Sequence, residues 1–147
     1  METKMRYILP FLLLATPALA GGDYIQPVTD PLTQAECSAC HMAFPPRLLP
    51  SESWRKIVGN LSNHYGEDAS LPAADAKAIA DYLAGATKSA KTVKGMDPAN
   101  PPMRITELRW FTHEHNGEVS AARKKKAGSM ANCTACHRGA DKGYFED

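Results

Sequence analysis

The chain has 147 residues, with 17 lysines and arginines, 16 aspartates and glutamates, and a formal net charge of +1 at pH 7. This near-neutral balance argues against nucleic-acid binding, which needs an excess of basic side chains to meet the phosphate charge. The length is enough for one or two small modules.

The first 20 residues, METKMRYILPFLLLATPALA, have the pattern of an export signal. Lys4 and Arg6 precede an apolar stretch, and Ala18–Ala20 provides small residues for cleavage. The apolar stretch is too short to span a membrane, and prolines interrupt it. We therefore predict a signal peptide at residues 1–20 and a neutral mature protein in the periplasm, peripheral to the membrane at most.

All four cysteines lie in two copies of one pentapeptide, CSACH at residues 37–41 and CTACH at residues 133–137. Such pairs can form disulfides, bind zinc or act as redox dithiols, but none of these requires a histidine after the second cysteine at both sites. The pattern is the attachment signature of a c-type haem, in which the histidine binds the iron. We predict two covalent haem c groups, with thioether bonds at Cys37, Cys40, Cys133 and Cys136 and proximal iron ligands at His41 and His137.

A six-coordinate haem iron needs a second axial ligand, commonly Met or His. His64 follows apolar residues that recur at helical spacing from Trp54 onward, which predicts a helix from Ser51 to a stop at Gly66. A histidine on an apolar helix face is often only a packed core residue. In a chain with two haems and few histidines, we predict His64 as a distal ligand.

Residues 70–85, SLPAADAKAIADYLAG, predict the next helix, with Pro72 near its start and Gly85 at its end. The N-terminal haem module, residues 21–87, thereby resembles a class I cytochrome c, which also closes with a helix ending in Tyr-Leu. A loop Met is the distal ligand of that class, and His64 replaces it here. The polar, Gly/Pro-bearing residues 88–103 are predicted to be a linker.

Residues 104–147 are predicted to form a smaller C-terminal haem module. The stretch RITELRWFTHEHNGEV predicts a helix ending near Gly117, with His115 on its apolar face and His113 pointing away. A ligand must emerge from the face that covers the haem, so we predict His115, with His113 as the weaker alternative. A basic helix at residues 120–127 and an attachment helix from Ser129 follow.

Other ligand arrangements stay open at this point. Met96 or Met103 gives one His/Met haem if it replaces a distal histidine. His64 reaches the second haem if ligation is crossed. The basic run at residues 123–126 is either a solvated helix face or a docking site for an acidic partner.

Taken together, the chain resembles the small bis-histidine dihaem cytochrome c family of proteobacterial periplasms. The resemblance covers the chain after residue 20 and rests on the phrases CSACHMAFPPRLLPSESW, NHYGEDASL, RITELRWFTHEHNGEV and NCTACHRGADKGYFED. His64 and His115 match the distal ligands of that family. The resemblance implies a shuttle that takes electrons from a membrane b-type cytochrome or quinol donor to a soluble periplasmic haem protein or reductase.

The predicted fold is all-α and loop-rich, because no segment alternates as a strand does. If both irons carry two imidazoles, no coordination site is open to a substrate, which favours an electron carrier over an enzyme. Two rivals remain: a small dihaem enzyme, similar to a peroxidase or a nitrite reductase, with one open haem, and a haem subunit of a respiratory complex.

Overall fold

The computed structural model describes residues 24–146, so the predicted signal peptide lies outside the described residues. Helices and short 3-10 turns (η) are its regular elements, and between residues 24 and 146 the only β-pairing is two isolated bridges. The predicted all-α, loop-rich fold is confirmed. No helix in this range is long and apolar enough to cross a membrane.

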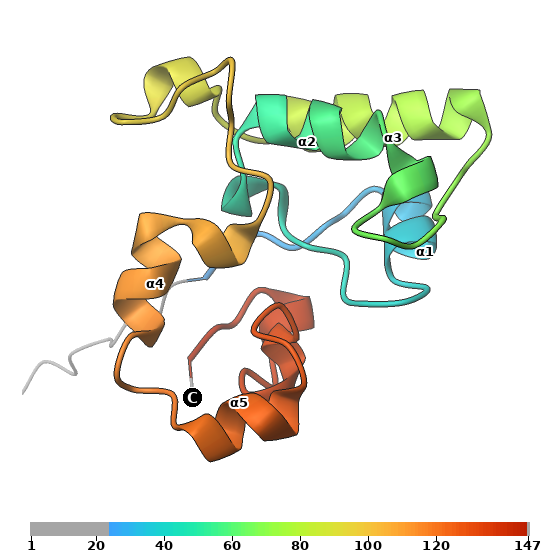
Figure 1. The fold of residues 1–147 in the computed structure, drawn as a ribbon. Coiled ribbons are helices and arrows are strands. Elements are labelled where there is room, and N and C mark those ends of the chain that lie inside the picture. Colours follow the sequence, from blue (N-terminus) through green and yellow to red (C-terminus); the bar gives the residue numbers. More distant parts are fainter. Residues whose placement is uncertain (1–23, 147) are drawn as a thin grey trace, which may run out of the picture.

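The first half of the chain is built around two helices that pack side by side, α2 (Ser51–Val58) and α3 (Ala73–Gly85) (Figure 1). A third helix, α1 (Pro31–Cys37), lies against α3. The carboxylate of Asp30 caps α1 by accepting a 2.8 Å hydrogen bond from the Thr33 amide. Their shared core includes the buried side chains of Trp54, Ile57, Ile79 and Leu83.

The predicted helix from Ser51 to Gly66 is wrong in its second half. α2 ends at Val58, and the chain then passes through a single 3-10 turn, η2 (Leu61–Asn63). Gly59 and Asn60 are poor helix formers, and Asn60 has φ −138°, outside the helical region. His64 therefore lies in a loop and not on a helix face.

The segment at residues 88–103, predicted to link the modules, is held against α2. The Ser51 amide donates to the Lys88 carbonyl at 3.0 Å, and the Glu52 carboxylate accepts from the Ala90 amide at 2.7 Å. Ala90, in the 3-10 turn η3 (Ala90–Thr92), is completely buried. The segment is therefore packed over this part of its length, and the module boundaries proposed above stay a prediction.

The second half of the chain contains α4 (Arg109–His115) and α5 (Ala121–Ala127), with 3-10 turns η4 (Ile105–Glu107), η5 (Cys133–Ala135) and η6 (Ala140–Lys142). The predicted continuous helix is broken at Leu108, whose ψ of 140° is extended and whose side chain is buried in the core. The attachment helix predicted from Ser129 is only the turn η5. The basic helix α5 is confirmed, with Ser120 as its side-chain cap.

The two ends of the described chain meet. The Ile25 amide donates to the Gly143 carbonyl at 2.9 Å, and the rings of Tyr24 and Tyr144 lie 5.3 Å apart. Gly143 has φ +89°, and a Cβ added there would lie 2.3 Å from the Ile25 carbonyl oxygen. We name this contact between residues 24–25 and 143–144 the terminal clasp.

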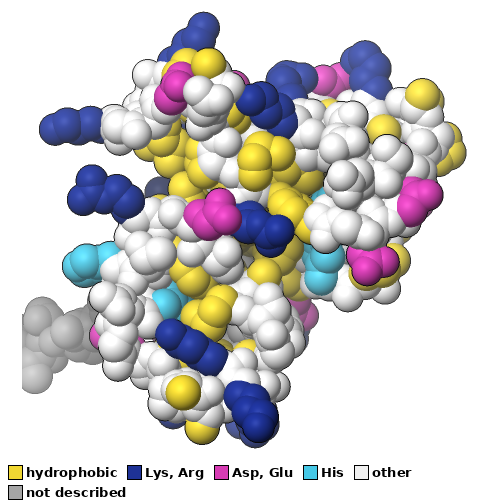
Figure 2. All heavy atoms as spheres, viewed as in Figure 1, with side chains coloured by type: hydrophobic (Ala, Val, Ile, Leu, Met, Phe, Trp, Pro, Cys, Tyr) yellow, Lys and Arg dark blue, Asp and Glu magenta, His cyan; other side chains and the backbone are white. Residues whose placement is uncertain are grey.

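Figure 2 shows how side chains are distributed on one face of the molecule. Hydrophobic side chains gather in a band across the middle of this face, and lysines and arginines stand mainly toward its edges. On this face, the apolar surface therefore gathers between the two halves of the chain.

Candidate haem sites

The first pentapeptide follows directly from the end of α1. α1 ends at Cys37, so residues 38–41 form the turn after the helix. Cys37 is half-buried and Cys40 is exposed, and burial raises the pKa of the Cys37 thiol. The second pentapeptide repeats this arrangement around η5, with Cys133 half-buried and Cys136 exposed. No disulfide joins the cysteines of either pentapeptide.

His41 is held in the orientation that a metal ligand needs. Its Nδ1 lies 2.7 Å from the Met42 carbonyl oxygen, which can only accept, so Nδ1 carries the proton. Its ring also stacks on Phe44, with 4.9 Å between ring centres. This tautomer leaves Nε2 free to bind iron.

His64 faces His41 from the turn after η2. The two ring centres are 6.1 Å apart, and the rings are 19° from parallel. Burial, assisted by the nearby His41, lowers the pKa of His64 and favours the neutral form that binds metals. The buried Nδ1 of His64 has no hydrogen-bond partner among the described residues.

His115 and His137 form the corresponding pair in the second half. Nδ1 of His115 donates to the Phe111 carbonyl at 2.9 Å, and the two rings stack with centres 4.0 Å apart. The His115 and His137 ring centres are 6.0 Å apart, with an angle of 89° between the planes. The structure thus brings together His41 with His64 and His115 with His137, and does not show a crossed arrangement.

Both spacings fit an iron held between two imidazoles. Two metal–nitrogen bonds of about 2 Å, plus about 1 Å from each nitrogen to its ring centre, place the centres about 6 Å apart. The separations of 6.1 Å and 6.0 Å agree with this value. Each pair also lies beside its own pentapeptide, so the residues present fit one covalently attached haem at each site.

The competing residues belong to neither histidine pair, although Met103 lines the cavity beside His64 and His113 lines the one beside His115. The His113 side chain is 85% exposed, and its Nδ1 lies 3.3 Å from the Glu114 carboxylate. Met96 and Met103 are partly buried hydrophobics packed against the core. Within residues 24–146 no group of three or more His, Cys, Asp or Glu side chains converges as a metal site.

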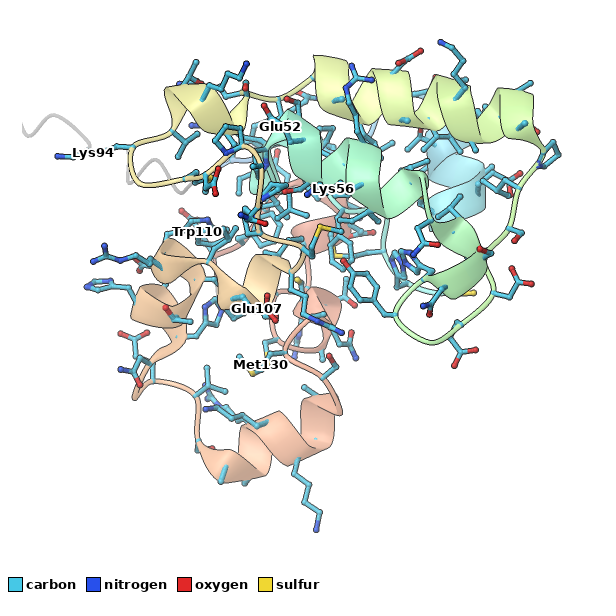
Figure 3. The ribbon with its side chains drawn as sticks, turned by 45° about the horizontal axis from the view of Figure 1, so that its top comes forward. Glu52, Lys56, Lys94, Glu107, Trp110 and Met130 are labelled. Carbon is cyan, nitrogen blue, oxygen red and sulfur yellow. The ribbon has the colours of Figure 1, made fainter. Side chains whose placement is uncertain are left out.

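Each histidine pair adjoins a cavity. One of about 720 Å³ is lined by Phe111, His115 and Met130, and by the basic Arg109 and Lys124. Figure 3 shows Met130 between α4 and α5. This cavity is lined by His115 of the second pair, and neither His137 nor the cysteines of the second pentapeptide are in its lining.

The other cavity reveals residues that sequence reasoning missed. It measures about 310 Å³ and lies beside His64, with Tyr65, Met103 and Arg104 in its lining. The Arg104 guanidinium lies 4.4 Å from the centre of the Tyr65 ring. The signal that points to Tyr65 is its position before Gly66, since a residue followed by glycine is typical of a tight turn.

Comparison with known proteins gives a consistent match. Residues 33–145 match the family model described as dihaem cytochrome c. The diheme cytochrome c from Rhodobacter sphaeroides is 47% identical, with a TM-score of 0.75, and the match covers 82% of this chain and 99% of that one. A second structure, of DHC purified from Rhodobacter sphaeroides, is 49% identical with a TM-score of 0.71, covering 81% and 99% of the two chains.

A more distant structure agrees with these two. The diheme cytochrome type c from Shewanella baltica is 35% identical, with a TM-score of 0.66, over 79% of this chain and 86% of that one. No curated protein matches the chain. The similarity to the solved structures therefore extends over most of the sequence at high identity.

Proposed function

This chain belongs to the dihaem cytochrome c family, and from this we propose that it is an electron carrier whose two irons are both closed by histidine pairs. Membership gives it two covalently bound haem c groups and the role of a haem electron-transfer protein. Bound haem supplies a one-electron couple at its iron. The protein contributes attachment, orientation and burial. The finer assignment, which we propose, gives the first iron to His41 and His64 and the second to His115 and His137.

The observation that carries the proposal is the agreement of two independent ring separations, 6.1 Å and 6.0 Å, with bis-imidazole ligation. The residues of the two pairs come from different parts of the chain, so the two separations are independent observations. Two histidines on each iron leave no position for a substrate. This supports a carrier over an enzyme.

The spectrum of the ferric protein tests this proposal. Two bis-histidine irons are expected to be fully low-spin and to lack the weak red charge-transfer band of methionine ligation. The reduced protein is expected not to bind carbon monoxide without denaturant. A high-spin component, or carbon monoxide bound to the native reduced protein, contradicts closed ligation and favours the enzyme alternative.

We further propose that the carrier works in the periplasm between a membrane b-type cytochrome and a soluble acidic haem protein, which docks over α5. α5 has no buried residue, and the basic side chains of residues 123–126 form no ion pair among the described residues. Four unpaired like charges on one short helix repel each other, and an acidic surface would relieve this repulsion. Lys124 also lines the cavity beside His115, so this surface adjoins the second haem site.

The docking surface is tested by the rate of electron exchange with an acidic ferredoxin as the probe. The rate is expected to fall steeply with ionic strength, because salt screens attraction between surface charges. Replacing Lys124 and Lys125 by Gln should lower the low-salt rate about tenfold and flatten the salt dependence. The matched variant Lys94→Gln, an exposed lysine near η3, should leave both unchanged. Equal losses in both variants contradict a docking surface on α5.

A further inference from the structure

The turn that carries His64 is held by a contact from residues just before η4, and we infer that this contact positions His64 against its iron. The contact joins Tyr65 to Met103 and Arg104, and we name these three residues the latch. The inference rests on the proposed ligation of the first iron by His64. It gives Tyr65 and Arg104 a positioning role, since neither touches the iron.

The backbone at Tyr65 is in a conformation that tyrosine avoids. His64 and Glu67 exchange backbone hydrogen bonds of 2.8 Å and 3.2 Å, so Tyr65 and Gly66 are the two central residues of a tight turn. Their φ angles are +57° and +103°. Such turns favour asparagine or glycine at the first central position, because a bulky side chain clashes there. Tyr65 is the one non-glycine residue with positive φ among residues 24–146.

The latch supplies the interactions that hold Tyr65 in this conformation. Its hydroxyl donates a hydrogen bond to the Met103 carbonyl oxygen. Its ring lies beneath the Arg104 guanidinium, 4.4 Å from ring centre to carbon, in a cation–π contact. Arg104 is itself held by Glu107, with 3.6 Å between Nε and the carboxylate. Met103 therefore contacts the hydroxyl of Tyr65, and Arg104 contacts its ring.

The segment just before the latch, residues 99–102, is hydrogen-bonded to α2, which restricts its movement. Lys56 donates from Nζ to the Ala99 carbonyl at 2.7 Å, and Ser53 donates from Oγ to the Pro102 carbonyl at 2.5 Å. Both donors belong to α2, whose Trp54 and Ile57 side chains lie in the core of the first half. Residues 99–102 are thereby fixed immediately before the latch.

His64 depends on this support more than His41 and His115 do. The Nδ1 atoms of His41 and His115 each bond to a backbone carbonyl, which fixes the ring orientation. The Nδ1 of His64 is buried without a hydrogen-bond partner. Its ring is instead met edge-on by Tyr65, with 4.9 Å between centres and 69° between planes. The latch therefore substitutes for the hydrogen bond that His64 lacks.

Cyanide binding to the ferric protein tests this inference, because cyanide can enter only when the distal histidine leaves its iron. Tyr65→Asn keeps a residue suited to the turn and removes both latch contacts, so the binding rate at one haem should rise about tenfold or more. Tyr65→Phe and Arg104→Gln each remove one contact and should give rises of a few-fold. The other haem should bind cyanide at the wild-type rate.

A matched control separates the latch from the general loss of a tyrosine hydroxyl. The Tyr82 hydroxyl accepts a 2.8 Å hydrogen bond from the Thr29 amide, in the same half of the chain but away from the His64 turn. Tyr82→Phe should leave both cyanide rates unchanged. An equal acceleration in Tyr82→Phe and Tyr65→Phe would overturn the inference.

His64→Ala distinguishes failure of the inference from failure of the proposed ligation. It should give one high-spin haem that binds cyanide without a slow step, and adding Tyr65→Asn should produce no further acceleration. If His64→Ala leaves both haems low-spin, the ligation itself is wrong, and the latch inference falls with it. If His64→Ala opens one haem while Tyr65→Asn, Tyr65→Phe and Arg104→Gln all keep the wild-type rate, ligation stands and the latch is rejected.

Discussion

His113 and His115 lie two residues apart on α4, about half a helical turn, and their environments differ. The His115 ring stacks on the buried Phe111 and donates to its carbonyl, whereas the His113 side chain is 85% exposed. Because positions two apart on a helix point in nearly opposite directions, only one of the two can face the interior. This is the physical reason for assigning the second distal position to His115.

We expect His115→Ala to convert one haem to a high-spin form that binds carbon monoxide when reduced, because alanine leaves the sixth position open. His113→Ala is the natural control and should retain the wild-type spectrum. Absorption and electron paramagnetic resonance spectra of the ferric proteins measure the difference. A high-spin signal from the His113 variant alone would reverse the assignment.

At the residue scale, covalent motifs were easier to predict than supporting contacts. The spacing of Cys and His in the two pentapeptides is enough to predict haem attachment. Helical periodicity predicts His115 as the distal ligand. The family match is consistent with both haems, while the distal histidines remain assignments that the ring separations support. Tyr65 and Arg104 escaped prediction because they are separated by many residues and meet only in the folded chain.

Among the helices, α2 is joined to the segment around η3 by the side chain of Glu52. Its carboxylate accepts hydrogen bonds from the Ala90 amide and from the hydroxyls of Ser89 and Ser51. These bonds favour the charged form and lower the pKa of Glu52 from 4.5 to about 2. Figure 3 shows Glu52 on α2, at the end near η3.

Glu52 should therefore stabilise the fold in a pH-dependent way. A carboxyl whose pKa is lower in the folded state stabilises above its unfolded pKa, and this stabilisation is lost as pH falls from about 4.5 to about 2. The thermal midpoint of Glu52→Gln should lie below that of wild type at pH 7, and the difference should shrink to near zero by pH 2. Glu118→Gln, at an exposed position, should show no such difference. A constant difference in thermal midpoint between wild type and Glu52→Gln from pH 7 to pH 2 contradicts a stabilising role for the Glu52 charge.

The terminal clasp predicts a large effect for a small substitution. Gly143→Ala places a Cβ 2.3 Å from the Ile25 carbonyl oxygen at a φ of +89°, so both crowding and backbone strain oppose it. We expect a loss of about 3 kcal/mol in the free energy of unfolding, measured by chemical denaturation. Gly95→Ala has a φ of +82° with nothing near its Cβ, and should lose only about 1 kcal/mol. Equal losses would show that crowding against Ile25 is unimportant.

Element ends with a strong local signal were predicted, and those without one were not. α3 begins after Pro72 and ends at Gly85, and α5 is capped by Ser120, as the sequence indicates. α2 ends earlier than predicted because Gly59 and Asn60 are weak helix formers. The helical spacing of apolar residues continues past them, so here periodicity and helix propensity disagree. The break at Leu108 follows from core packing and has no local sequence signal.

The two halves of the molecule differ in how much protein core they have. The first half buries Trp54, Ile57, Ile79 and Leu83 together. Beyond Arg109, the buried hydrophobic residues in the described part of the chain are Phe111 and Ala140. So small a core cannot offset the entropy of ordering this segment, and the second half must rely on its haem.

Loss of covalent haem attachment at the second pentapeptide should therefore unfold only part of the molecule. Replacing Cys133 and Cys136 by Ala should leave residues after 108 open to protease, while one low-spin haem persists in the protected N-terminal fragment. Limited proteolysis with mass spectrometry and the fragment's spectrum measure this. The reciprocal variant, Cys37→Ala with Cys40→Ala, should destabilise the whole chain. Protease resistance of residues 109–146 in the first variant contradicts a haem-dependent second half.

The terminal clasp also has a consequence for the order in which the protein is made. A chain emerges from the ribosome with its N-terminus first, so CSACH and His64 are present long before residues 143–144. The clasp needs residues 143–144, so it can form only after both pentapeptides have been made. Maturation should then proceed from the first haem to the second, with the terminal clasp forming after both pentapeptides are in place. For anyone producing the protein, an affinity tag fused directly after Asp147 would crowd this last step more than a tag on a long spacer.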